Sequence, residues 1–265
     1  MHRIGCWSHR ADLISVKTRL DKLVVDRGLA PSRERARALI LAGKVLVNEQ
    51  KVEKAGSLVG SGARLRMLGA DLRYVSRGGL KLEKALEHWG IDLRGKVCLD
   101  VGASTGGFSD CMLQHGATRV IAVDTGYGQM DFGLRKDARM RLLEKTNARY
   151  LEHGDIGERV DFIAMDVSFI SATLVLPAVI RATAGESERQ IVVLVKPQFE
   201  AGRELVGKGG IVRDEAAQLA AVAKVEAALR DFGCEAIEWI ESPILGGEGN
   251  REFLVHAEIL PPGVR

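Results

Sequence analysis

Four ionisable residues stand where an apolar segment of the sequence begins or ends. They are Lys81 in VSRGGLK, Asp166 in AMDVSFIS, Lys196 in LVKPQFE and Glu252 in GNREF. Two lysines and two carboxylates that converge make a poor hydrophobic core, so their position needs a functional reason. A lysine can take up a proton or stabilise developing negative charge, and carboxylates can hold lysines in place by hydrogen bonds. We therefore take the four residues as a candidate catalytic set.

Each of the four also has an alternative explanation when it is considered alone. Lys81 fits a solvated position on a helix, and Asp166 fits a helix N-cap. Glu252 fits an ion pair with Arg251 or with a neighbouring strand. Lys196 has no comparable alternative, because a lysine inside an apolar segment is rarely buried without a partner. The grouping of the four residues, and not any one of them, supports the catalytic interpretation.

The elements that carry these residues alternate between strand-like and helix-like segments. Apolar runs of strand length cover Val97–Val101, Val120–Asp124, Asp161–Asp166, Ile191–Lys196 and Ala236–Ile240, and helical stretches include Phe108–Gln114 and Asp214–Asp231. This pattern predicts an α/β fold with a doubly wound, mainly parallel sheet. The last run, Glu252–Leu260, follows a hairpin-like glycine-rich segment, Gly246–Asn250, and is expected to be antiparallel. Ligands of such sheets bind beyond the carboxyl ends of the strands, where the four residues would meet.

The first strand runs directly into a glycine-rich loop, LDVGASTGGFSD. Asp124 ends the second strand, where a carboxylate can accept both hydroxyls of a ribose. The loop has neither the GK[ST] of a P-loop nor the GxGxxG of a dinucleotide fold, so S-adenosylmethionine is the expected ligand. A purely structural turn is the alternative. The expected ligand contacts are Asp100, Gly102, Ser104, Thr105, Gly106, Gly107, Phe108, Asp124 and Asn147.

The charge of the chain is unevenly distributed. Residues 1–80 hold 16 Lys+Arg against 7 Asp+Glu, whereas residues 81–265 hold 22 against 28. A small basic segment is typical of a module that holds phosphate backbones, although a solvated basic face is equally compatible with these counts. Within it, Leu20–Val24 and a segment that follows Ser32 have helical spacing, and Val45–Val47 and Ala63–Met67 alternate as strands.

The segment RLDKLVVDRGLAPSRERARALILAGKVLVN resembles the S4 RNA-binding domain. The resemblance covers residues 18–68 and implies binding of structured RNA through an arginine-bearing helix and the turn after it. Arginines on a rigid helix can grip successive phosphates, and A-form RNA is read mainly by shape and backbone. The expected RNA contacts are Arg19, Arg33, Arg35, Arg37 and Lys44.

The catalytic set, in its order along the chain, resembles the K-D-K-E arrangement of FtsJ/RrmJ-type RNA 2′-O-methyltransferases. Together with the S4-like segment, the whole chain from Thr18 to Leu260 resembles the TlyA family, often labelled hemolysins. The resemblance implies methylation of cytidine 2′-hydroxyls in ribosomal RNA of one or both subunits, with S-adenosylmethionine as donor and no metal. It also implies an S4 domain at 18–68 and, at 76–265, a Rossmann-like methyltransferase domain with a mainly parallel sheet of seven strands, the last of them antiparallel. We expect an extension at residues 1–17 and a linker at 69–75.

Within this interpretation Lys196 is the general base or the group that orients the hydroxyl, and orientation is expected to dominate. A catalytically inactive factor that only binds ribosomal RNA is the alternative function. The family label raises membrane lysis as a third idea, but the sequence has no apolar segment long enough to span a bilayer and no strongly amphipathic lytic helix. No export signal is evident, and the four cysteines show no metal-ligand or disulfide pattern, so we expect a cytoplasmic protein.

Overall fold

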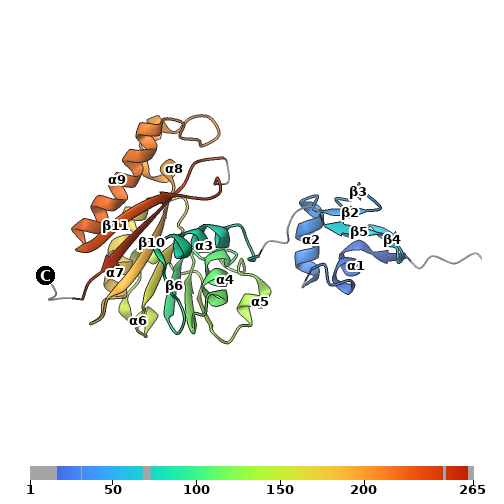
Figure 1. Cartoon of the computed structure of the whole chain (residues 1–265), viewed down its shortest axis with the longest axis horizontal. Helices are drawn as coiled ribbons and strands as arrows, with labels where there is room; N and C mark the ends of the chain where they lie inside the picture. The colour runs from blue at the N-terminus through green and yellow to red at the C-terminus, as the bar shows by residue number, and fades with distance from the viewer. Residues whose placement is uncertain (1–16, 31, 68–72, 247–248, 262–265) are drawn as a thin grey trace, which may run out of the picture. The chain divides into compact units, whose positions relative to one another are not determined.

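The computed structural model describes residues 17–30, 32–67, 73–246 and 249–261. The chain divides into two compact units, Met1–Asp71 and Leu72–Arg265, and each is described by itself (Figure 1). Residues 1–16 of the expected extension and residues 69–72 of the expected linker lie outside the described residues. The same is true of Gly247 and Glu248 in the glycine-rich segment.

The first unit packs two helices against two small antiparallel sheets. Its elements are β1 (Lys17–Arg19), α1 (Leu20–Asp26), α2 (Arg33–Leu41), β2 (Val45–Val47), β3 (Gln50–Lys51), β4 (Leu58–Gly60) and β5 (Leu65–Met67). One sheet pairs β1 with β4, and the other has the order β3-β2-β5. The apolar faces of the two helices and of β2 meet in one core that includes Leu20, Val24, Ile40 and Val45.

Local sequence explains most of this unit. Ser32 accepts a hydrogen bond from the backbone N–H of Arg35 at 3.2 Å, as expected of the residue that caps α2. Asn48 and Glu49 form the two-residue turn between β2 and β3, and both have positive φ, as a type I′ turn requires. The sequence did not predict β1 and β4, because Lys17–Arg19 holds no apolar residue and Leu58–Gly60 shows no alternation.

The second unit is built on a seven-stranded sheet of order β11-β12-β10-β9-β6-β7-β8. The strands are β6 (Val97–Val101), β7 (Arg119–Val123), β8 (Met140–Leu143), β9 (Phe162–Met165), β10 (Arg189–Val195), β11 (Cys234–Glu241) and β12 (Phe253–Ile259). All are parallel except β12, which lies between β10 and β11 and runs antiparallel to both. The predicted fold class, including the direction of the last strand, is confirmed.

Helices cover both faces of this sheet (Figure 1). One face packs against α3 (Gly78–Trp89), α4 (Gly107–Gln114) and α5 (Phe132–Arg135), and the other against α6 (His153–Ile156), α7 (Leu176–Ala182) and α9 (Glu215–Asp231). The short elements α8 (Pro197–Glu200), η1 (Ala148–Tyr150), η2 (Ala172–Leu174) and η3 (Arg203–Leu205) complete the unit. Side chains alternate between the faces, so on β6 Leu99 and Val101 contact the α7 side and Cys98 contacts the α4 side.

Candidate active site

Strand register explains why distant polar residues converge at one edge of the sheet. Asp100 on β6 is directed to the face covered by α4, where Ser109 Oγ donates to its Oδ2 at 2.5 Å. Asp166 and Lys196 follow β9 and β10 in the same alternation as the buried residues Ala164 and Leu194 of that face. Because both residues stand at carboxyl ends of adjacent parallel strands, they meet at the same edge.

The antiparallel direction of β12 brings Glu252 to this edge as well. Glu252 directly precedes β12, whose first residue, Phe253, is paired with Val195 at the end of β10. The helix α3 lies over this face and carries Lys81. The topology therefore gathers all four residues of the candidate catalytic set, although Lys81 and Glu252 are 171 positions apart in the chain.

The four residues form two ion pairs. Lys81 Nζ donates to Glu252 Oε2, and the two side chains are only 10% and 3% exposed. Lys196 Nζ lies 2.5 Å from Asp166 Oδ1 and also donates to Ser168 Oγ at 2.7 Å. Each lysine is thus held by a carboxylate and not left as an exposed charge.

The alternative explanations for Lys81 and Glu252 disagree with this geometry. Lys81 is buried on α3 and is not a solvated helix lysine. Arg251 pairs with Glu241 at 2.6 Å and with Glu215 at 3.4 Å, whereas Glu252 points to Lys81. Asp166 pairs with Lys196, and it is Ser171 whose side chain accepts from the first turn of η2.

Two cavities, of about 240 and 410 Å3, open at this edge of the sheet. Of the expected site residues, Lys81, Asp100, Thr105, Gly107 and Phe108 line the smaller cavity, Asp124 and Asn147 line the larger, and Gly102, Ser104 and Asp166 line both. In the described part of the chain, Lys196, Glu252 and Gly106 line neither. Lys196 and Glu252 reach the cavities through the partners that they hold, Asp166 and Lys81.

Two glycines of the loop after β6 have different tasks. Gly102 has φ +87°, and a Cβ at this position would lie 2.4 Å from the carbonyl oxygen of Asp166. Glycine there allows the loop to approach the end of β9, so that both cavities share a wall. Gly106 has φ +94°, and a Cβ there would lie 2.4 Å from Met130 Sδ and from Leu134 Cδ1. Gly106 therefore allows close packing at the start of α4, and its expected contact with the ligand stays a prediction.

Asp100 is a buried acid of the site whose pKa is strongly raised. Its side chain is fully buried, and burial raises its pKa to about 7 even though the hydrogen bond from Ser109 favours the ionised form. Its Oδ1 is buried without a hydrogen-bond partner among the described residues. A buried, unpartnered acceptor in a cavity wall suits a ligand that brings a cationic or hydrogen-bond-donating group.

Asp124 and Asn147 lie in the wall of the larger cavity. The Asp124 carboxylate accepts backbone N–H groups from Ser104 at 2.7 Å and from Gly126 at 2.6 Å, which fixes its orientation. Each carboxylate oxygen can accept a further hydrogen bond, so ribose hydroxyls remain possible partners. Asn147 Oδ1 accepts from the backbone N–H of Arg149 at 3.1 Å and caps η1.

The cavities also have walls outside the predicted set. Ser76, Arg77 and Gly246 line the smaller cavity, and Phe169 lines the larger. Phe169 is 92% exposed and has φ +64°, a backbone conformation that is uncommon for a bulky residue and often marks functional sites. In the sequence, the glycine pair after Arg77 could have indicated that the backbone comes close to another segment there. The exposure and the backbone conformation of Phe169 could not be predicted, because they follow only from the fold.

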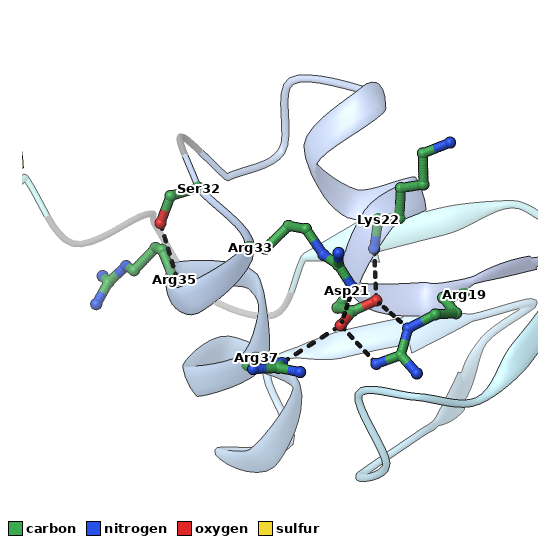
Figure 2. A network of polar contacts seen from close by, with 7 residues as sticks. All are labelled: Arg19, Asp21, Lys22, Ser32, Arg33, Arg35 and Arg37. Carbon is green, nitrogen blue, oxygen red and sulfur yellow. Dashed lines mark hydrogen bonds and ion pairs between the residues drawn. The ribbon is translucent and has the colours of Figure 1, made fainter. Parts of the chain in front are cut away.

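The residues expected to contact RNA do not form one row on α2. Arg19, Arg33 and Arg37 gather around Asp21, a residue that was not in the predicted set (Figure 2). Arg35 points away from Asp21. Lys44 is exposed beyond the end of α2. Three of the expected RNA contacts therefore form one cluster with Asp21, and the contact of all five residues with RNA stays a prediction.

The described residues contain no group of three or more His, Cys, Asp or Glu side chains arranged to hold a metal ion. No helix within the described ranges combines the length and apolarity needed to cross a bilayer.

Comparison with known proteins agrees with these observations. The FtsJ-like methyltransferase family matches residues 74–259, and the S4 domain matches residues 18–65. The 16S/23S rRNA (cytidine-2′-O)-methyltransferase TlyA of Mycobacterium tuberculosis is 42% identical over 90% of this chain and 89% of its own length. Hemolysin A of Brachyspira hyodysenteriae is 39% identical over 90% of this chain and 98% of its own length.

A solved structure from Streptococcus thermophilus is 44% identical and superimposes with a TM-score of 0.71, over 93% of this chain and 90% of that one. The similarity spans both units and includes the sheet edge where the two ion pairs lie. The chain belongs to the FtsJ-like methyltransferase family and carries an S4 domain before its methyltransferase domain.

Proposed function

We propose that the protein transfers a methyl group from S-adenosylmethionine to the 2′-hydroxyl of a cytidine in ribosomal RNA. The observation that carries the proposal is the place of Asp166. It lines both cavities and is paired with Lys196, so a charged pair stands where the donor and the acceptor hydroxyl would meet.

The residues of the two cavities fit S-adenosylmethionine. Asp100 offers a buried acceptor without a partner to the cationic methionine end, and the Asp124 carboxylate suits the ribose. Gly102 lets the loop pack against the backbone of Asp166, because a Cβ there would lie 2.4 Å from the Asp166 carbonyl oxygen. When bound, the donor supplies an electrophilic methyl group on a sulfonium sulfur.

The pair of Lys196 and Asp166 prepares the hydroxyl. A ribose hydroxyl is a weak nucleophile at neutral pH, so its oxygen must be oriented and its developing negative charge stabilised. Contacts to Asp166 and Ser168 fix the direction of the Lys196 side chain, which leaves one ammonium N–H to point at the hydroxyl oxygen. The hydroxyl proton passes to the Asp166 carboxylate as the new oxygen–carbon bond forms. Positioning is the main contribution of the pair.

The pair of Lys81 and Glu252 has a supporting role in this proposal. Lys81 lines the smaller cavity, and the Lys81 ammonium group is paired with Glu252, whose side chain is almost fully buried. A cation at this position stabilises negative charge near the reacting oxygen.

Ribosomal RNA is the proposed partner because the first unit belongs to the S4 type and carries an arginine cluster. We place the protein in the cytoplasm, because the relatives named above come from bacteria, which assemble their ribosomal subunits there.

The test is incubation of the full chain with labelled S-adenosylmethionine and separated small and large ribosomal subunits, followed by mapping of ribose methylation. Label on a cytidine 2′-oxygen is expected, and Lys196→Ala should abolish it. Isothermal titration with S-adenosylmethionine is the control, because Lys196 lines neither cavity and the variant should still bind the donor.

Two results would contradict the proposal. Absence of label in RNA from both subunits, with donor binding intact, would leave a factor that only binds RNA. Label on a base would keep the fold and the donor site but discard the roles of Lys81 and Lys196.

A further inference from the structure

The side chain of Asp21 is fully buried because arginine side chains cover it. Arg19 Nε and Nη2 donate to Asp21 Oδ1 and Oδ2 at 3.1 and 2.8 Å, and Arg33 Nη2 donates to Oδ2 at 3.1 Å. Arg37 Nε lies 3.4 Å from the same Oδ2. Figure 2 shows the three guanidinium groups converging on one carboxylate.

The cluster keeps an excess of positive charge at the surface. Three guanidinium groups face one carboxylate, and the arginine side chains are still 44%, 50% and 53% exposed. Each guanidinium has five N–H donors. The contacts with Asp21 use two nitrogens of Arg19 and one each of Arg33 and Arg37, so further donors are left for an external anion.

The backbone makes this arrangement rigid. Arg33 and Arg37 are one helical turn apart on α2 and share a face, whereas Arg35, two positions from each, lies on another. Ser32 fixes the start of α2 by its cap, and Arg19 directly precedes α1, which carries Asp21 in its first turn. The backbone N–H of Lys22 donates to Asp21 Oδ1 at 2.8 Å and holds the carboxylate itself.

A structural role alone does not account for three arginines. One bidentate arginine, such as Arg19, is enough to pair a carboxylate, and further cations around it repel each other. Planar guanidinium groups held at fixed angles are instead the usual means of recognising phosphate.

We propose that Asp21 is a positioning residue that holds Arg19, Arg33 and Arg37 as a preorganised site for backbone phosphates of structured RNA. The inference rests on the proposed function, in which RNA is the substrate. Asp21 does not touch the RNA in this proposal; it acts through the three arginines.

The proposal predicts a change of opposite sign to that expected from charge alone. Asp21→Asn removes a negative charge, so a simple sum of charges predicts tighter RNA binding. If Asp21 positions the arginines, their side chains are mobile in the variant and become ordered only when RNA binds. This ordering lowers the affinity for RNA by about two- to tenfold for each arginine side chain. We expect the affinity to fall about tenfold. The slope of log affinity against log salt should become shallower by about one, because fewer phosphates are engaged.

The experiment measures binding of the full chain to 16S and 23S rRNA transcribed in vitro, by filter binding at several salt concentrations. Glu34→Gln is the matched control, because it makes the same charge change at an exposed position of α2, the helix that carries Arg33 and Arg37. It should leave the affinity unchanged or raise it slightly. Circular dichroism checks that Asp21→Asn keeps the helices of the first unit.

A second pair of variants decides the matter even if Asp21→Asn fails to fold. Arg37→Lys keeps the charge but loses the planar group next to Asp21, whereas Arg66→Lys makes the same exchange on an arginine of the same unit that is paired with Glu49 and not with Asp21. We expect Arg37→Lys to weaken binding about threefold or more and Arg66→Lys to change it by less than twofold, within the range for one ordered side chain. In a folded Asp21→Asn background, Arg37→Lys should add little.

The inference is overturned if folded Asp21→Asn binds RNA as tightly as the wild type or more tightly, or if the two lysine variants behave alike. Methyl transfer is measured in parallel on the wild type. If the wild type neither binds nor methylates RNA, the proposed function itself fails; if it does both while the Asp21 variants bind normally, only the positioning role fails.

Discussion

Replacement of Lys81 by Met tests whether the buried pair of Lys81 and Glu252 is an essential unit. The variant leaves the Glu252 carboxylate, 3% exposed, without its cation. Breaking a buried ion pair by removing one partner typically costs about 3–5 kcal/mol of stability. For a unit of this size, each kcal/mol corresponds to about 2–4 °C in Tm, so we expect a fall of roughly 6–20 °C.

Glu252→Gln and the double variant complete the thermodynamic cycle. The double variant no longer contains a buried, unpaired charge, so it should be more stable than the sum of the two single changes predicts, by about 2–3 kcal/mol. Urea unfolding is followed by the fluorescence of Trp89 and Trp239, which both lie in the second unit, in a Trp7→Phe background.

The matched control is the surface pair of Arg94 and Asp92, whose side chains are 81% and 55% exposed. Arg94→Gln should change the free energy of unfolding by less than about 1 kcal/mol. If Lys81→Met costs no more than this control, or if the two single changes simply add, the burial argument is wrong. All three variants of the buried pair should lose methyl transfer, and activity in Lys81→Met would remove Lys81 from the site.

Three further predictions concern backbone space and pH. Gly102→Ala places a Cβ 2.4 Å from the Asp166 carbonyl oxygen, so binding of S-adenosylmethionine measured by calorimetry should weaken by at least about tenfold. Gly128→Ala is the control, because Gly128 also has a positive φ but open space around it, and this variant should bind the donor as the wild type does. Because burial raises the pKa of Asp100 to about 7, wild-type stability should fall as the pH rises from about 4 to 7, and this slope should vanish from chemical denaturation curves of Asp100→Asn. The hydrogen bond from Arg19 and the charge of Arg19 hold the pKa of Asp21 well below its usual range. The stability that Asp21 contributes is therefore present above about pH 4 and is lost as the pH falls further. In an acid titration followed by circular dichroism, Asp21→Asn should be less stable than the wild type at neutral pH and should lack this acid-dependent loss.

The sequence predicted most strands of the sheet because they are short and mainly apolar. The run Val97–Val101 coincides with β6, and Asp214 caps the long helix α9 as its position suggests. These elements are determined by local composition, which a single sequence contains. The convergence of Asp166 and Lys196 at one edge followed from the parallel topology, since each residue directly follows its own strand.

The pairing of the charges could not be predicted in the same way. Nothing near Glu252 in the sequence indicates Lys81 as its partner, and Arg251 stands next to it. The choice depends on β12 lying between β10 and β11 and on α3 covering the same face of the sheet. Both are properties of the whole fold. Long-range order of this kind is invisible to local patterns, although it decides which lysine is buried.

The arginine cluster shows the opposite situation, in which a local rule was available but incompletely used. Residues four apart on a helix share a face, so Arg33 and Arg37 could have been separated from Arg35 on spacing alone. The burial of Asp21 could not, because an acidic residue in a first helical turn is usually explained by the helix dipole.

The two sites use carboxylates to orient cations, but they differ in net charge. At the sheet edge, two lysines face two carboxylates, whereas in the first unit three arginines face Asp21 alone. Excess positive charge governs the salt-dependent attraction of a nucleic acid backbone, and a balanced set contributes little to it. The first unit is therefore suited to binding RNA. In the second unit, the balanced ion pairs can place ammonium groups beside a reacting hydroxyl without binding phosphates nonspecifically. With RNA as the proposed substrate, this difference in charge explains why the acidic methyltransferase unit is joined to a basic unit that binds the RNA.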